Sequence, residues 1–213
     1  MFLKYYQKLD DAISYLFSSV SNEKKLLKSY FSNKKIIYID IGTNEGGYLD
    51  FLSSFIKFKK IICFEPIKHL SDKLSTKYSK LNLLNFNLAV SNKNQTKFFY
   101  QYEISSQSSF YKQNDLFKSL KNLKKKFKIK SIKFDSFFKK KEKIDFCKID
   151  VQGEEMNVLK GMAKHLKTKK IDLIKIELSF VERYEKVKPN FYDILVFLNK
   201  FNYHLLSISK IKY

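Results

Sequence analysis

Short apolar runs alternate with stretches in which apolar residues recur at helical spacing. The apolar runs lie at residues 35–41, 60–65, 81–90, 96–103, 143–151 and 171–180. The helix-like stretches lie at 48–58, 68–78, 154–166 and 191–201. Strands that alternate with helices of this length predict βαβ units and a parallel sheet. The pattern therefore predicts an α/β fold with a doubly wound, mainly parallel sheet, whose ligand lies at the carboxyl ends of the strands.

The three runs around 36–41, 61–64 and 146–151 are continuously apolar rather than alternating. Such runs are typical of strands covered by helices on both faces. Within residues 1–33, apolar positions recur at helical spacing from Leu9 to Val20, and the stretch NEKKLLKSYF follows them, which predicts two amphipathic helices ahead of the main domain. We therefore expect an N-terminal helical extension at 1–33 and a Rossmann-like domain at 34–213.

Composition places the chain among globular proteins of one domain. Its 213 residues suffice for one α/β core, and 44% of them are hydrophobic. The formal net charge of +21 invites a nucleic-acid or acidic-membrane partner. Arg183 is, however, the only arginine among 42 basic residues, and nucleic-acid recognition depends on arginine for bidentate contacts. The total charge therefore identifies no partner, and we expect no nucleic-acid partner.

The cysteines and the N-terminus bear on the compartment. Cys63 and Cys147 lie inside apolar runs, so we expect them in the core and not in a disulfide, which favours a reducing compartment. The N-terminal stretch MFLKYYQKLDDAISYLF alternates charged with apolar residues, unlike a secretory signal. No run approaches the ~20 apolar residues of a membrane span. We expect a cytoplasmic protein without a membrane span.

Three of the 5 glycines fall in one segment, YIDIGTNEGGY. A predicted strand leads through Asp40, Gly42 and Gly46 into a predicted helix. Glycine at such a turn permits positive φ and lets a ligand approach the main chain, and the N–H groups of the helix N-terminus face that ligand. The spacing differs from G-x-G-x-x-G, so a nicotinamide or flavin cofactor loses support. An ordinary tight strand-to-helix turn is the alternative explanation.

Polar groups also end the next two predicted strands. Glu65 in ICFEP precedes Pro66, and an acid at this place in a nucleoside-binding α/β fold can accept hydrogen bonds from both ribose hydroxyls. The third strand ends in FNLAVSN, where Asn87 and the main chain around Leu88 and Ala89 are placed to meet an adenine edge. Together with the glycine turn, these strand ends predict a pocket for S-adenosylmethionine.

Acidic residues gather in CKIDVQGEEMNVLKG. Asp150 leaves an apolar run, and Glu154 and Glu155 fall in the first turn of the next predicted helix, where negative charge is favoured by the helix dipole. Glu177 ends the later run LIKIELS and is expected to face the same cleft. These acids are either groups of a reaction site or only a strand-end cap and helix N-terminal charges.

The series YIDIGTNEGGY, CFEP, NLAVSN, SIKFDSFF and KIDVQGEEMNVLKGM, closing with IKIELS, resembles the FkbM family of S-adenosylmethionine-dependent methyltransferases. The resemblance covers about residues 36–180, and the block from Asp150 to Gly161 is its most specific part. It implies a class I, Rossmann-like methyltransferase fold. Two positions depart from the family pattern: Lys133 replaces the threonine of a TLD motif whose acid is Asp135, and Gln152 stands where many members have glutamate.

The resemblance also implies roles for single residues. Asp150, Gly153 and Glu155 match a second family signature at the mouth where acceptor meets methyl donor, and the loop Ser105–Phe110 corresponds to a serine-bearing segment. The expected cofactor-binding residues are Asp40, Gly42, Asn44, Gly46, Glu65, Pro66, Asn87, Leu88, Ala89 and Asp150.

The implied activity is O-methylation of a sugar, a glycan or a small natural product. An alcohol has a high pKa, so a general base or a metal is expected to help. Asp150 is the first candidate for base or metal ligand, followed by Glu155 and Glu177. A divalent cofactor ion held by carboxylates stays open, although no His/Cys cluster has zinc spacing. Two alternatives also stay open: an RNA methyltransferase, suggested by the charge, and a non-catalytic binding module.

Overall fold

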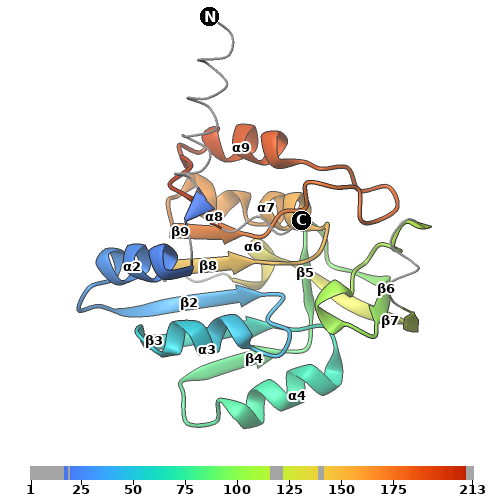
Figure 1. The fold of residues 1–213 in the computed structure, drawn as a ribbon, viewed down its shortest axis with the longest axis horizontal. Coiled ribbons are helices and arrows are strands. Elements are labelled where there is room, and N and C mark those ends of the chain that lie inside the picture. The colour runs from blue at the N-terminus through green and yellow to red at the C-terminus, as the bar shows by residue number, and fades with distance from the viewer. Residues whose placement is uncertain (1–16, 19, 116–121, 139–141, 210–213) are drawn as a thin grey trace, which may run out of the picture.

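Five parallel strands form the central sheet of the computed structural model, which describes residues 17–18, 20–115, 122–138 and 142–209. The strands are β2 (Lys35–Ile41), β3 (Lys57–Phe64), β4 (Leu83–Phe86), β8 (Ile144–Ile149) and β9 (Ile171–Ile176). Their spatial order is β4-β3-β2-β8-β9 (Figure 1). The chain winds outward from β2 to β4 and then returns beside β2 as β8, so strand order reverses between β2 and β8. This is the doubly wound α/β fold that the sequence predicts.

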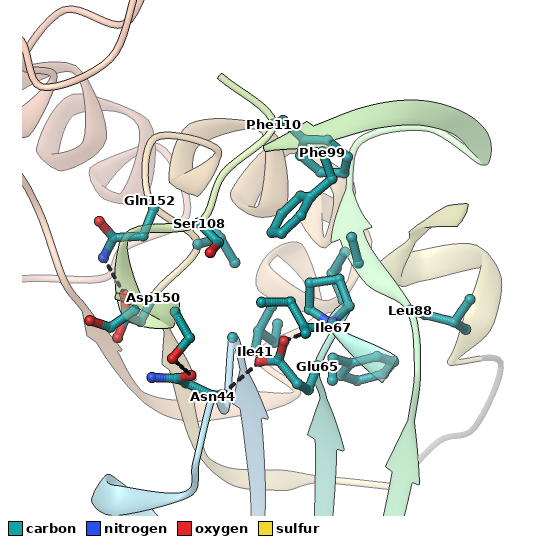
Figure 2. A pocket seen from close by; sticks show the side chains of 18 residues that line it. Ile41, Asn44, Glu65, Ile67, Leu88, Phe99, Ser108, Phe110, Asp150 and Gln152 are labelled. Carbon is teal, nitrogen blue, oxygen red and sulfur yellow. Dashed lines mark hydrogen bonds between the residues drawn. The ribbon is translucent and has the colours of Figure 1, made fainter. Parts of the chain in front are cut away.

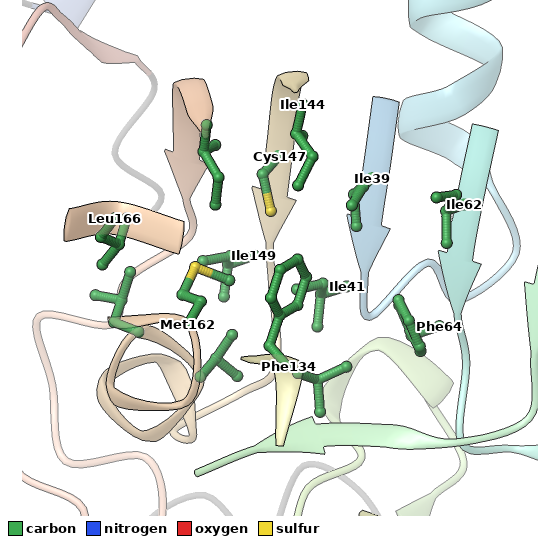
Figure 3. Packing of buried hydrophobic residues seen from close by; sticks show 14 of the residues in the cluster. Ile39, Ile41, Ile62, Phe64, Phe134, Ile144, Cys147, Ile149, Met162 and Leu166 are labelled. Carbon is green, nitrogen blue, oxygen red and sulfur yellow. The ribbon is translucent and has the colours of Figure 1, made fainter. Parts of the chain in front are cut away.

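Helices cover both faces of this sheet. They are α2 (Val20–Tyr30), α3 (Gly47–Ser53), α4 (Lys68–Lys77), α6 (Phe134–Phe137), α7 (Glu155–Gly161), α8 (Ala163–Lys167) and α9 (Phe191–Asn199). Side chains of β2 alternate between the faces: Tyr38 packs with residues of α2, α3 and α4, whereas Ile39 packs with residues of α6 to α9. Figure 3 shows the second of these cores, with Phe134 and Met162 beneath the sheet. Covering on both faces explains the continuous apolar runs.

The sequence pattern predicts one strand over 81–90, but the structure contains two strands there. β4 ends at Phe86, and β5 (Ala89–Ser91) belongs to a second sheet, ordered β5-β7-β6, with β6 (Gln95–Tyr102) and β7 (Leu123–Lys133). β7 pairs in parallel with β5 and antiparallel with β6. The change of sheet was missed because β5 finds its partner far along the chain, which an apolar pattern does not record.

Other boundaries also differ from the prediction. The helix predicted over 48–58 ends at Ser53, because residues from Lys57 onward join β3. The helix predicted over 154–166 is divided into α7 and α8 at Met162.

The N-terminal region agrees with the prediction in part. Most of the first predicted helix lies outside the described residues, and Phe17–Ser18, placed within its pattern, form strand β1, paired in parallel with β10 (Ile208–Ser209). The second predicted helix is α2, and its Leu27, together with Phe31 directly after the helix, packs in one core cluster with residues of β2 and β8. The domain boundary at residue 33 stays a prediction.

Candidate active site

A cavity of about 570 Å³, including space open to solvent, lies at the carboxyl ends of β2, β3 and β8. We call it the first cavity (Figure 2). The second sheet and the short 3-10 helix η1 (Ser105–Gln107) close it from the other side. Seven of the ten residues predicted to bind the cofactor line it: Gly42, Asn44, Glu65, Pro66, Leu88, Ala89 and Asp150. The fold thus brings together residues from the three strand ends that the sequence singled out.

The other three predicted residues, Asp40, Gly46 and Asn87, do not line the first cavity. Asp40 is fully buried in β2 and accepts a hydrogen bond from the Tyr38 hydroxyl. Gly46 precedes α3 at a φ of 80°, and its carbonyl accepts a hydrogen bond from the Tyr78 hydroxyl. The Asn87 amide donates to the carbonyl oxygens of Glu65 and Pro66. Asn87 therefore fixes the main chain that carries Glu65.

Glu65 is held from two sides by the main chain. One carboxylate oxygen accepts a hydrogen bond of 2.7 Å from the N–H of Asn44, and the other accepts one of 2.8 Å from the N–H of Ile67. Burial raises the pKa of Glu65 to about 7, although these two N–H groups oppose the shift. Each carboxylate oxygen has a second lone pair, so the group can still accept hydrogen bonds from a ligand in the cavity.

The loop that follows β6 closes on the glycine turn. The Ser105 hydroxyl donates a hydrogen bond of 2.7 Å to the side-chain oxygen of Asn44, which has a φ of 52°. Phe99 and Phe110 are in edge-to-face contact and form an apolar wall of the first cavity. The sequence motifs included Phe110 but did not indicate Phe99. Phe99 comes from the inner face of β6, and only pairing within the second sheet brings it here, whereas Phe110 lies in the loop after η1.

Gly42 lies against the end of β8. A Cβ atom on Gly42 would lie 1.8 Å from the carbonyl oxygen of Asp150, and Gly42 has a φ of +84°. Both the space and the backbone conformation therefore require glycine. This contact joins the ends of the two strands between which strand order reverses.

Lys148 is a site residue that the sequence analysis missed. It is buried on β8 directly opposite Asp40 on β2. Its ammonium group lies 3.1 Å from the carboxylate of Asp150 and 3.4 Å from the carbonyl oxygen of Gly42. Burial acts to lower the pKa of Lys148, but the charges of Asp40 and Asp150 outweigh it and raise the pKa. The sequence did contain a signal for Lys148, because a lysine inside an apolar run, as in FCKID, needs an acidic partner when the strand is buried.

Asp150 is oriented by two neighbours. Lys148 holds one carboxylate oxygen, and the Gln152 amide donates a hydrogen bond of 2.8 Å to the other. The Gln152 oxygen in turn accepts a hydrogen bond from the Tyr184 hydroxyl. Gln152, where the family often has glutamate, therefore serves as an amide that bridges an acid and a phenol.

The two remaining predicted acids lie in another cavity. This second cavity, of about 490 Å³ including open space, is lined by Glu155 and Glu177 together with Arg183 and Tyr184. Gln152 lines both cavities, so they adjoin at this side chain. The structure thus divides the three predicted catalytic acids, with Asp150 in the first cavity and the two glutamates in the second.

Glu155 is almost fully buried at the start of α7. Its carboxylate accepts hydrogen bonds from the N–H groups of Gly153 and Val151. Burial raises the pKa of Glu155 to about 7, against the effect of these hydrogen bonds. Glu154 beside it faces elsewhere and accepts hydrogen bonds from the hydroxyls of Ser91 and Tyr111. Of these two neighbouring acids, Glu155 lines the second cavity, whereas Glu154 lines neither of the two cavities described.

Asp135, the acid of the TLD-like motif, supports a helix. Its carboxylate accepts hydrogen bonds from the N–H groups of Lys164 and His165 and lies 2.6 Å from Nδ1 of the His165 ring. Lys133, which replaces the motif's threonine, uses its main-chain N–H to donate to Asn94. Neither residue lines the two cavities.

The residues that the structure describes contain neither a cluster of metal-binding side chains nor a membrane-spanning helix. Over that part of the chain, no group of three or more His, Cys, Asp or Glu side chains is arranged to hold a metal ion. Within the same residues, no helix is long and apolar enough to cross a bilayer. The divalent metal stays an untested prediction.

Residues 40–205 match the family model described as the methyltransferase FkbM domain. A crystal structure of methyltransferase FkbM from Methylobacillus flagellatus KT is similar with a TM-score of 0.44 and 16% identity, over 66% of this chain and 32% of that one. A SAM dependent methyltransferase from Aquifex aeolicus has a TM-score of 0.41 and 16% identity, over 84% of this chain and 78% of that one. This chain thus corresponds to about a third of the first protein. No curated protein matches the sequence.

Proposed function

The chain belongs to the FkbM family of S-adenosylmethionine-dependent methyltransferases, and on this premise we propose that it methylates a hydroxyl group of a sugar, a glycan or another small natural product. The matched segment contains every residue named above that lines the first cavity. The observation that carries the proposal is the carboxylate of Glu65, buried at the end of β3 and aimed by two main-chain N–H groups.

The first cavity fits S-adenosylmethionine in its chemistry, with an acid, two aromatic rings and exposed main-chain groups around one hollow. Glu65 would accept hydrogen bonds from the ribose hydroxyls, and Phe99 and Phe110 would face the adenine ring. Gly42 and Asp150 would border the methionine part, where the missing side chain of Gly42 leaves main-chain groups accessible.

Bound S-adenosylmethionine supplies a methyl group already activated by a sulfonium, so the protein mainly orients the acceptor and accepts its proton. We assign the acceptor to the second cavity, which adjoins the first at Gln152. Asp150, held by Lys148 and Gln152, would orient the hydroxyl at this boundary. Glu155, with a pKa of about 7, would accept the proton, because a base is most effective when its pKa lies near the working pH.

Titration with S-adenosylhomocysteine tests the cofactor part of the proposal. We expect calorimetry to show binding by the wild type that weakens about 10- to 100-fold in Glu65→Gln, since a hydrogen bond to a charged group contributes about 1.5–3 kcal/mol. Glu103→Gln is the matched control, because Glu103 is an exposed glutamate outside both cavities. Wild-type protein that does not bind the compound would exclude the proposal and favour the non-catalytic alternative.

Labelled methyl transfer tests the acceptor part. Wild type and Asp150→Asn are compared on a pool of cell-wall sugars and on total RNA. Transfer to the sugar pool that drops in Asp150→Asn supports the proposal. Transfer to RNA alone would replace it with the RNA methyltransferase.

A further inference from the structure

Strands β6 and β7 expose one face of the second sheet, which lies beyond the carboxyl ends of β2 and β8 (Figure 1). Cross-strand pairs build this face: Lys126 with Tyr100, Lys128 with Phe98, and Lys130 with Thr96. We call these six residues the basic face. The intervening residues Phe99 and Ile129 turn inward and pack in a core cluster with Phe110. The sheet therefore has one face in the domain and one toward solvent.

The positive charge of this face is not balanced by neighbouring acids. β7 reads LKKKFKIKSIK, which is six lysines in 11 residues, and neither β6 nor β7 contains an acidic residue. In contrast, Lys68 and Lys77 on α4 each form an ion pair with an aspartate. Among the described residues, no lysine of β7 forms an ion pair. Clustered charge of one sign attracts a partner of the opposite sign.

Large apolar side chains are exposed on and beside this face. Phe98 is 49% exposed, Leu123 at the start of β7 is 46% exposed, and Ile104 just beyond β6 is 44% exposed. Leu123 and Ile104 are close, because the N–H of Glu103 donates to the carbonyl of Asn122. The ammonium of Lys126 lies 4.4 Å from the centre of the Phe98 ring. Lysine and apolar surface are thus interleaved.

We propose that the basic face docks the protein on the surface of an anionic lipid bilayer. Lysine ammonium groups are attracted to anionic headgroups, and apolar side chains beside them enter the boundary between headgroups and acyl chains. Docking by this outer face leaves the inner face, with Phe99 on the first cavity, undisturbed. The attachment is peripheral, and it goes beyond the methyl-transfer function without depending on it.

The composition of the face favours lipid over nucleic acid. The face contains no arginine, the residue that gives bidentate contacts to guanine and phosphate. Lys126 and Lys128 lie 4.4 and 5.5 Å from the centre of the Phe98 ring, where a stacked base would have to displace them. Leu123 and Ile104 offer nucleotides no stacking surface, whereas an acyl layer accepts them.

Vesicle co-sedimentation of the full chain tests the proposal. We expect binding to vesicles of mixed phosphatidylcholine and phosphatidylglycerol, weakened by salt, and little binding to phosphatidylcholine alone. A charge variant replaces four exposed lysines of β7 by glutamine: Lys124, Lys126, Lys128 and Lys130. The control replaces four exposed lysines elsewhere: Lys73, Lys80, Lys160 and Lys167. Both variants have the same net charge, so a difference between them reports the position of the lysines. The β7 variant should lose at least about 100-fold in affinity for the mixed vesicles, and the control far less.

A second variant, Phe98→Ser with Leu123→Ser, keeps the charge and removes apolar surface. It should weaken vesicle binding about 10-fold and make the remaining binding more sensitive to salt. Circular dichroism and S-adenosylhomocysteine titration establish that each variant is folded. Equal losses in the β7 variant and the lysine control would overturn the proposal in favour of total charge. Tighter binding of the wild type to poly(U) RNA than to the mixed vesicles, lost in the β7 variant, would overturn it in favour of nucleic acid.

Discussion

The ammonium group of Lys148 lies 3.5 Å from the carboxylate of Asp40, its partner on the neighbouring strand. Both side chains are buried, and they join β2 to β8 where strand order reverses. Gly42 directly follows β2 and Asp150 directly follows β8, and both residues line the first cavity. The pair therefore links the stability of the sheet to the geometry of the candidate site.

Replacing Lys148 by Met should lower the free energy of unfolding by about 3–5 kcal/mol, because it leaves the buried Asp40 without a cation. The double variant Asp40→Asn/Lys148→Met should be more stable than Lys148→Met alone. Urea unfolding measures the free energies of the wild type, of Asp40→Asn, of Lys148→Met and of the double variant. Lys68→Met on the exposed face of α4 is the control and should cost no more than about 0.5 kcal/mol. A double variant as unstable as the sum of its single changes would contradict the coupling.

Gly42→Ala should destabilise the protein by at least about 2 kcal/mol, since its Cβ atom would meet the Asp150 carbonyl and alanine is strained at positive φ. It should also weaken binding of S-adenosylhomocysteine, because the end of β8 must move. Gly47→Ala is the matched control: a Cβ atom there meets nothing within 4 Å, and alanine favours the helix α3 that begins at this residue. Urea unfolding of the two variants should therefore give changes of opposite sign or very different size.

The ligand-free protein should lose stability as pH rises toward 7. Burial raises the pKa of Glu65 from 4.5 to about 7, so between these values the folded state binds a proton that the unfolded state has released. In Glu65→Gln the fall in unfolding free energy between about pH 5 and about pH 8 should be smaller by about 2–3 kcal/mol. Urea titrations at the two pH values provide the comparison. An unchanged fall would mean that Glu65 is ionised throughout this range.

The rate of methyl transfer should rise as pH passes through about 7, where Glu155 loses its proton and can act as a base. Glu155→Gln should lower the rate about 100-fold and remove this rise while leaving affinity for S-adenosylhomocysteine unchanged. Glu177→Gln is the comparison, since Glu177 lines the same cavity but is exposed. A pH dependence that survives in Glu155→Gln would assign the proton to another group.

The sequence by itself determined the α/β class, four of the five central strands with small boundary errors, and the three strand ends that meet at the first cavity. These features depend on contacts between neighbouring residues and on the rule that parallel strands end at one edge of a sheet. Glu65 was predictable for this reason: an acid placed directly after an apolar strand has to lie at that edge. The glycine turn was predictable because so few residues tolerate its conformation.

Only the tertiary structure decided which acids share a cavity. Asp150 and Glu155 are only five positions apart in the sequence, yet they line different cavities. The turn between them, where Gln152 and Gly153 both have positive φ, directs the two acids apart. Lys148 became a site residue through its register with Asp40, and Phe99 reached the first cavity through a second sheet that no local pattern records. Pairing between strands that are distant in the sequence determines these positions. An apolar pattern reflects only residues that are near one another in the sequence, so it does not predict such pairing.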